Sequence, residues 1–213
     1  MFAVDLARFR QIPLQRDPFD YVIVPDFIRP EARPALSEDF PVITGPGSYP
    51  VRQLRSGPAF AALLQDLHTA EVRQAFEEKF SLDLKPLPTV ITVRGRSGPR
   101  DGHIHTDLPG KVITVLIYMN SCWEGDGGRL RLLRSARDLD DVITEVPPVD
   151  GTLLAFRRTD NSFHGHKPFI GERRVIQLNW VTRWHSWWLW RQDVNQRLAD
   201  LARRWLPAAA RSA

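Results

Sequence analysis

The sequence predicts a mainly β protein, a jelly roll with helices packed against it. From Leu87 onward, short runs of β-branched and apolar residues alternate with turns that contain glycine or proline, which is typical of a sandwich or jelly roll. Before that point apolar residues recur at helical spacing, as at Phe60, Leu63 and Leu67, and we expect these helices to cover one face of a sheet. A chain of 213 residues is long enough for one such core.

The part of the chain before residue 87 is expected to form one early strand and several helices. Helices are expected over 6–12, 30–36 and 59–80, a strand over 21–27, and a loop over 41–51. Pro30 favours a helix start because proline is tolerated in the first helical turn. Pro25 closes the strand, since proline cannot donate to a sheet ladder.

The part of the chain after residue 87 is expected to form the sheets. Strands are expected over 89–93, 111–119, 129–133, 152–156 and 173–182, with a loop over 94–102 that leads to a further strand carrying His105 and a charged insert over 135–141. The run from Lys111 to Met119 is apolar on both faces, so we expect it at the centre of a sheet.

We expect residues 1–213 to form a single domain. Within it, residues 1–86 are a helix-rich support with an early strand, residues 87–184 are the jelly-roll core, and residues 185–213 are a C-terminal helix and tail. The sequence has no internal repeat or linker that would separate a second domain.

Composition sets limits on the class of protein. The formal net charge is +4, a mild excess that fits an anionic ligand but also an ordinary arginine-rich surface. The single cysteine, Cys122, excludes an intramolecular disulfide and a cysteine zinc site, and it fits a reducing compartment. Charged residues come too early for a signal peptide, and no apolar run is long enough for a bilayer. We therefore expect a soluble, cytoplasmic protein with no membrane partner.

A candidate metal site begins with His105-Thr-Asp107. In a strand, side chains two residues apart point to the same face, so His105 and Asp107 can bind one ion. A second imidazole can come from His164 or His166, which share strand parity and are not separated by facing. Two imidazoles and one carboxylate with open positions are the ligand set of non-haem Fe(II) oxygenases.

The last expected strand places an arginine beside this site. Arg173, Val175, Gln177 and Asn179 share the more polar face, which suits a cavity lining, whereas the opposite face is apolar and suits packing under helices. A buried cation needs an anionic partner. We expect that partner to be the carboxylate of a ligand or an acidic side chain.

These residues resemble the 2-oxoglutarate- and Fe(II)-dependent dioxygenases, in their prolyl-4-hydroxylase-like branch. The resemblance covers roughly residues 87–184 and rests on His105-Thr-Asp107, Tyr118-Met-Asn120, Gly127 to Leu132, and His164-Gly-His-Lys-Pro168 with Gly171-Glu-Arg173. In that family the distal histidine precedes a proline and then the basic residue that binds 2-oxoglutarate. Pro168 and Arg173 stand at the matching distances from His164, so the resemblance selects His164 as ligand, with His166 in a position that is usually apolar.

The resemblance implies a double-stranded β-helix, a cupin-like jelly roll, and a definite chemistry. Fe(II) would be bound by His105, Asp107 and His164, and Arg173 and Tyr118 would bind the distal carboxylate of the cosubstrate 2-oxoglutarate. O2 would be consumed, succinate and CO2 released, and ascorbate is a further cofactor that the resemblance allows. Asp107 favours hydroxylation, since related halogenases have glycine or alanine there.

The substrate is left open by the sequence. Small molecules and peptides both fit, and Arg94, Arg96, Arg100, Lys111 and Arg131 are candidates to bind a polar or anionic group. Nucleic acid is not expected, because position 179 is Asn where related demethylases have a second arginine. The C-terminal tryptophans favour helix packing or a homodimer seam. Two alternatives remain at this point: a non-catalytic jelly-roll sensor, and a cupin-type metalloenzyme that does not use 2-oxoglutarate.

Overall fold

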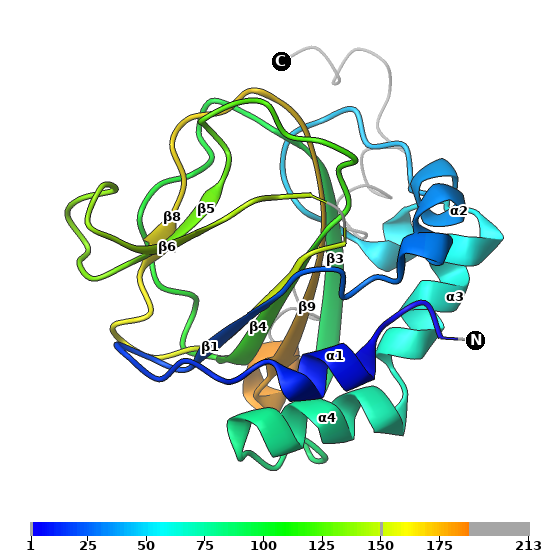
Figure 1. The fold of residues 1–213 in the computed structure, drawn as a ribbon, viewed down its shortest axis with the longest axis horizontal. Coiled ribbons are helices and arrows are strands. Elements are labelled where there is room, and N and C mark those ends of the chain that lie inside the picture. The colour runs from blue at the N-terminus through cyan, green and yellow to red at the C-terminus, as the bar shows by residue number, and fades with distance from the viewer. Residues whose placement is uncertain (1, 150, 188–213) are drawn as a thin grey trace, which may run out of the picture.

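The computed structural model describes residues 2–149 and 151–187, and it contains two antiparallel sheets (Figure 1). The larger sheet has six strands in the order β1-β7-β4-β9-β3-β2, and the smaller has three in the order β6-β5-β8. Their bounds are β1 (Tyr21–Val24), β2 (Tyr49–Pro50), β3 (Thr89–Ser97), β4 (Lys111–Tyr118), β5 (Leu130–Leu133), β6 (Val142–Val146), β7 (Leu153–Arg157), β8 (His164–Gly165) and β9 (Gly171–Val181). The predicted jelly roll with flanking helices is confirmed.

The helices lie on one face of the larger sheet (Figure 1). They are α1 (Leu6–Gln11), η1 (Pro30–Ala32), α2 (Arg33–Glu38), η2 (Val51–Gln53), α3 (Pro58–Leu67) and α4 (Ala70–Phe80). The Thr69 hydroxyl accepts from the Val72 amide at the start of α4, and Ser81 ends that helix at φ 53°. Proline stands in the first turns of α2 and α3, where its missing N–H costs no helical hydrogen bond.

Two apolar cores flank the larger sheet. The first lies between this sheet and the helices and includes Phe60, Phe76, Ile176, Leu178 and Trp180. The second lies between the two sheets and consists of Phe19, Tyr21, Tyr118, Leu130, Leu132, Val146, Leu154, Phe156 and Val175. Because β9 contributes to both cores, its alternate residues face helices on one side and the space between the sheets on the other.

Strand β4 is third of six in the larger sheet, as its two apolar faces predicted. It pairs with β7 on one side and β9 on the other, for example through Leu116 with Leu154 and Gln177. The register shifts between Lys111 and Ile113, which marks an irregularity at the start of this strand. Such a bulge changes which side chains share a face.

Several expectations about local structure were wrong. Strand β2 lies within the stretch expected to be a loop, β3 continues to Ser97 into the next expected loop, and β6 was not expected. His105 makes only an isolated bridge with His164, and Asp107 lies outside any strand. Neither residue therefore belongs to the regular strand that the sequence predicted.

The C-terminal prediction is only partly covered by the structure. Residues 183–187 are helical, and the remainder of the expected C-terminal helix and tail, with Trp188 and Trp190, lies outside the described residues. Of the helices that the structure describes, none is long and apolar enough to cross a membrane. Trp184 and Trp187 are exposed.

Candidate active site

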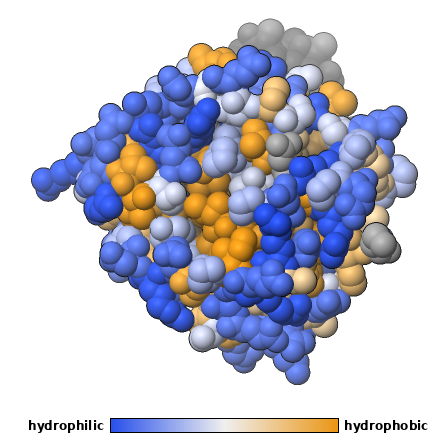
Figure 2. Space-filling model, in the orientation of Figure 1, coloured by the Kyte–Doolittle hydropathy of each residue, from blue (hydrophilic) through white to orange (hydrophobic). Residues whose placement is uncertain are grey.

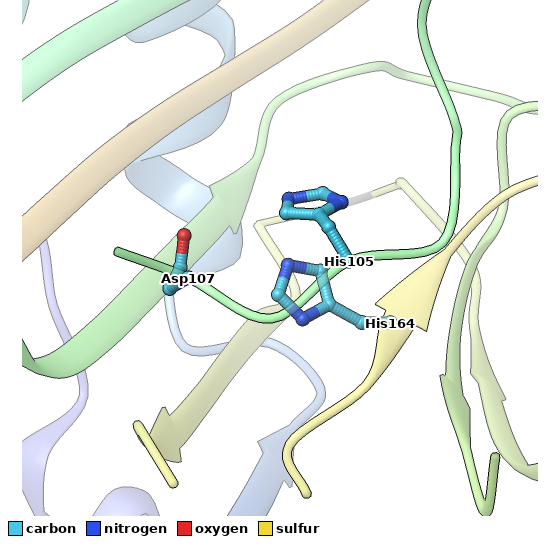
Figure 3. Close-up of side chains that lie close together, drawn as sticks. All are labelled: His105, Asp107 and His164. Carbon is cyan, nitrogen blue, oxygen red and sulfur yellow. The ribbon is translucent and has the colours of Figure 1, made fainter. Parts of the chain in front are cut away.

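Three side chains from two parts of the chain converge between the sheets. His105 and Asp107 come from the segment that joins β3 to β4, and His164 comes from β8 (Figure 3). One ligand atom from each of the three lies within 4.8 Å of the others, so a single ion can contact all three. The bridge between His105 and His164 fixes this approach, with backbone hydrogen bonds of 3.0 and 2.9 Å in the two directions.

Backbone carbonyls set the tautomers of both histidines. Nδ1 of His105 lies 2.8 Å from the His103 carbonyl, and Nδ1 of His164 lies 3.0 Å from the Ser162 carbonyl. A carbonyl oxygen only accepts, so each Nδ1 donates and each Nε2 keeps a lone pair for a metal.

The Asp107 carboxylate is held at both oxygens. Lys111 Nζ lies 2.6 Å from Oδ1, and the Thr114 hydroxyl lies 2.5 Å from Oδ2. Burial by itself would raise the pKa of Asp107, but the charge of Lys111 and these hydrogen bonds hold the pKa below its usual value. The carboxylate is therefore ionised and oriented before any metal binds.

Burial keeps His164 neutral. It lowers the pKa of His164 to about 4, against the opposing charge of Asp107. A neutral imidazole is the form that binds a metal.

A cavity of about 370 Å³ opens from this centre. It is lined by the three residues above together with Arg94, Arg100, Lys111, Leu130, His166, Arg173, Val175 and Gln177, among others. Seen from the side of Figure 1, the surface is hydrophilic around a band of apolar residues (Figure 2). Most lining residues are polar or charged, and the apolar side chains among them are Leu116, Leu130 and Val175.

Arg173 points inward, as strand parity predicted. It is 5% exposed, and its Nε donates to the Gly128 carbonyl at 2.8 Å. Gly128 has φ +75°, and a Cβ there would lie 2.6 Å from Trp123, so glycine is required at this position. No described carboxylate forms an ion pair with Arg173, and burial lowers the pKa of its guanidinium. The alternative expectation, that Arg173 forms an ion pair with Asp or Glu, is therefore not supported within the described residues.

Tyr118 lies beside this arginine. The guanidinium carbon of Arg173 is 5.4 Å from the centroid of the Tyr118 ring. The Tyr118 hydroxyl is buried and has no hydrogen-bond partner in the described part of the chain. Burial raises the pKa of Tyr118, so the hydroxyl keeps its proton and can donate. A buried donor without an acceptor costs free energy unless a ligand supplies one.

The other predicted site residues divide into two groups. Arg94, Arg100 and Lys111 line the cavity, as does the exposed His103. Arg131 does not, because it bonds Asp140 and Glu145, each at 2.6 Å. Arg96 is exposed outside the cavity. His166 is buried at the cavity wall with its Nδ1 donating to the Lys167 carbonyl, and it lies outside the three-residue cluster.

Thr114 was missed by the sequence analysis. Strand parity puts Lys111 and Thr114 on opposite faces, yet both bond Asp107. The register shift after Lys111 explains this, since one irregular residue re-aims the side chains that precede it. The glycine before Lys111 was the available signal of an irregular strand start.

Comparison with known families matches one part of the chain. Residues 95–182 match the model of the 2OG-Fe(II) oxygenase superfamily. This range contains His105, Asp107, His164 and both candidate cosubstrate residues. A search of curated proteins finds no significant match.

Comparison with solved structures finds similar folds at low identity. A prolyl-4-hydroxylase from Pseudomonas putida has 18% identity and a TM-score of 0.53, covering 84% of this chain and 91% of its own. A Phytophthora capsici prolyl 4-hydroxylase has 21% identity and a TM-score of 0.56, covering 86% and 67%. HygX from Streptomyces hygroscopicus, solved with nickel and 2-oxoglutarate, has 12% identity and a TM-score of 0.51, covering 76% and 83%.

Proposed function

We propose that this chain, which belongs to the 2OG-Fe(II) oxygenase superfamily, hydroxylates an unactivated carbon of a small-molecule or peptidyl substrate. The reaction would convert 2-oxoglutarate and O2 to succinate and CO2, with one oxygen atom passing to the substrate. The observation that carries this proposal is the convergence of His105, Asp107 and His164 within 4.8 Å.

The donor set fits Fe(II). Two neutral imidazoles and one carboxylate occupy one side of an ion and leave the other side open for ligands. His105 and His164 offer Nε2 because their Nδ1 atoms are engaged with backbone carbonyls. Iron bound there supplies O2 activation coupled to oxidative decarboxylation of 2-oxoglutarate, and the chain's own task is to orient the reactants.

Arg173 and Tyr118 fit the distal carboxylate of 2-oxoglutarate. Within the described residues, Arg173 is a buried cation without an acidic partner, and Tyr118 has a buried hydroxyl without an acceptor. A carboxylate placed between them would satisfy both through charge-assisted hydrogen bonds. The Gly128 carbonyl fixes the Arg173 side chain through Nε and leaves its terminal nitrogens for the ligand.

The alternatives explain less of the site. A non-catalytic binding protein needs no complete ligand set with preset tautomers. A cupin-type enzyme without 2-oxoglutarate leaves Arg173 and Tyr118 without partners. Asp107 at the carboxylate position, rather than a small residue, favours hydroxylation over halogenation.

The charge of the cavity favours an anionic substrate. Arg94, Arg100, Lys111 and Arg173 line it against two carboxylates, Asp101 and Asp107, which leaves a net charge of +2 with neutral histidines. A divalent metal and the 2-oxoglutarate dianion cancel each other, so this excess remains. Arg94 is paired with Asp101 at 2.5 Å, whereas exposed Arg100 has no ion pair within the described residues. Arg100 is therefore the cation available to a carboxylate or phosphate on the substrate.

Succinate formation tests both the proposed oxygenase function and the proposed anionic substrate class. Purified protein with Fe(II), 2-oxoglutarate and O2 is supplied with a panel of matched carboxylates and carboxamides, free and peptidyl. The function predicts succinate above the level of the Asp107→Ala variant, and protein that neither binds 2-oxoglutarate nor forms succinate would overturn it. The substrate class predicts stimulation mainly by the anionic members, reduced in Arg100→Gln. Stimulation by the amides alone would contradict that class.

A further inference from the structure

The Thr114 hydroxyl begins a chain of hydrogen bonds whose direction is fixed by Asp107. Its oxygen lies 2.5 Å from Asp107 Oδ2 and 3.1 Å from the Asn179 side-chain amide. A hydroxyl has one proton to donate, and an ionised carboxylate only accepts. Lys111 Nζ lies 2.6 Å from the other oxygen of this carboxylate, which makes Asp107 an acceptor, so the hydroxyl proton of Thr114 goes to Asp107, and the short distance agrees with a charge-assisted bond.

Asn179 must therefore donate to Thr114. The two ends of an amide have nearly the same shape, so its orientation follows from the bonds that each end makes. If Oδ1 faced Thr114, two buried oxygens would stand 3.1 Å apart with no proton between them. The rotated amide places Nδ2 there and forms the bond. Asn179 is 4% exposed, so an unmade bond would be costly.

The orientation of the Asn179 amide also determines the orientation of the Gln177 amide. The same end of the Asn179 amide lies 3.4 Å from the Gln177 side-chain amide. With Nδ2 of Asn179 as the donor, Gln177 must offer its Oε1. Gln177 lines the cavity together with Asp107, Lys111 and Thr114, whereas Asn179 lies behind it and does not. This leaves the amino group of Gln177 as the end that is turned to the cavity.

We propose that Gln177 presents a hydrogen-bond donor to the metal end of the cavity and positions a carboxylate oxygen of bound 2-oxoglutarate there. The inference rests on the proposed function and adds a second contact on β9 to the one at Arg173. Arg173 and Gln177 lie four residues apart on β9 and both line the cavity, so one ligand there can contact both side chains. Asp107 thus determines, through Thr114, Asn179 and Gln177, that a hydrogen-bond donor faces the cavity at this position.

Ligand binding to the full-length, Mn(II)-loaded protein tests this without turnover. Gln177→Met keeps the length of the side chain and removes its donor. We expect the Kd for 2-oxoglutarate to rise about tenfold, as for loss of a hydrogen bond to a charged group, while Mn(II) affinity changes less than about twofold. Succinic semialdehyde keeps the distal carboxylate but lacks the C1 carboxylate, so wild type and Gln177→Met should bind it alike.

Each other outcome has a distinct meaning. Equal 2-oxoglutarate affinity in wild type and Gln177→Met would overturn the inference. The same loss for both ligands would overturn it too, since it would indicate general damage to the cavity. Wild-type protein that binds Mn(II) but no 2-oxoglutarate would overturn the proposed function, and this inference with it. Gln177→Glu, which keeps an acceptor for Asn179 but replaces the donor with a charge, should bind 2-oxoglutarate more weakly than Gln177→Met.

Discussion

The two ends of the cavity differ in how their polar groups are satisfied. At the metal end, the Nδ1 atoms of His105 and His164 and both oxygens of Asp107 already have partners within the protein. At the other end, Arg173 has no acidic partner and the Tyr118 hydroxyl has no hydrogen-bond partner among the residues that the structure describes. We propose that the metal end is organised before its ion arrives, while the other end is completed by the ligand. On this proposal, preorganisation lowers the cost of metal binding, and the groups at the other end select a ligand with a carboxylate.

The largest effect is expected at the metal end. Asp107→Ala removes a ligand and leaves Lys111 and Thr114 without their acceptor. Metal affinity should fall by more than about a hundredfold, since loss of a ligand costs more than loss of a supporting group. Mn(II) titration measures this. Asp101→Asn is the matched control, because Asp101 also lines the cavity but is outside the cluster, and it should retain metal.

The second-largest effect is expected at Arg173, and it distinguishes the two ends of the cavity. Arg173→Ala should keep Mn(II) affinity and lose 2-oxoglutarate affinity by roughly a hundredfold, as expected when a buried charge pair loses one member. Calorimetry on the Mn(II)-loaded variant gives both values. Arg174→Ala is the control, because Arg174 points the other way and bonds Ser37. Wild-type affinity in the Arg173 variant would show that the cosubstrate does not use this arginine.

The neutral state of His164 gives the metal end a pH dependence. Because its folded pKa, about 4, lies below its unfolded value of 6.5, the folded state binds fewer protons. Stability from this group is complete above pH 6.5 and is lost as pH falls toward 4, by about 3 kcal/mol. Urea unfolding of metal-free protein at pH 7 and pH 4 should show this loss, and His164→Asn should show correspondingly less. The same pH dependence in both proteins would count against a buried, neutral His164.

The smallest effect concerns the unpaired hydroxyl. Tyr118→Phe removes a buried donor that lacks an acceptor, so the ligand-free protein should gain about 1 kcal/mol in free energy of unfolding. The same change should weaken 2-oxoglutarate binding roughly tenfold. A gain in the free energy of unfolding together with a loss of 2-oxoglutarate affinity is expected of a group whose hydrogen-bond partner is the ligand. A loss of stability in the ligand-free protein would mean that the hydroxyl is already bonded.

The local sequence pattern predicted much of the site, but it predicted less of the structure around it. Strand parity placed Arg173 inward, because β9 has a regular register from Val175 to Trp180 and separates a polar from an apolar face. The choice of His164 over His166 depended on the resemblance to a family, since parity treats them alike. The division into residues 1–86, 87–184 and 185–213 stays a prediction.

Other features depend on contacts between distant residues. Asp107 lies outside any strand, and its side chain is oriented by hydrogen bonds from Lys111 and Thr114. The two-residue strand β2 exists through pairing with β3, which its own proline-rich sequence does not indicate. In β6, the β-branched run from Val142 to Thr144 was an available signal beside the charged insert. The bulge at Lys111 could not be placed without its partner strand.

A crystal structure with Mn(II) and 2-oxoglutarate tests the difference between the two ends most directly. The quantity to measure is the distance from the distal carboxylate to the Arg173 terminal nitrogens and the Tyr118 hydroxyl. We predict hydrogen bonds of about 3 Å or less to both, with the side chains of His105, Asp107 and His164 in the positions described above. A distal carboxylate bound instead at Arg94 or Lys111, with Tyr118 still unpaired, would contradict the account.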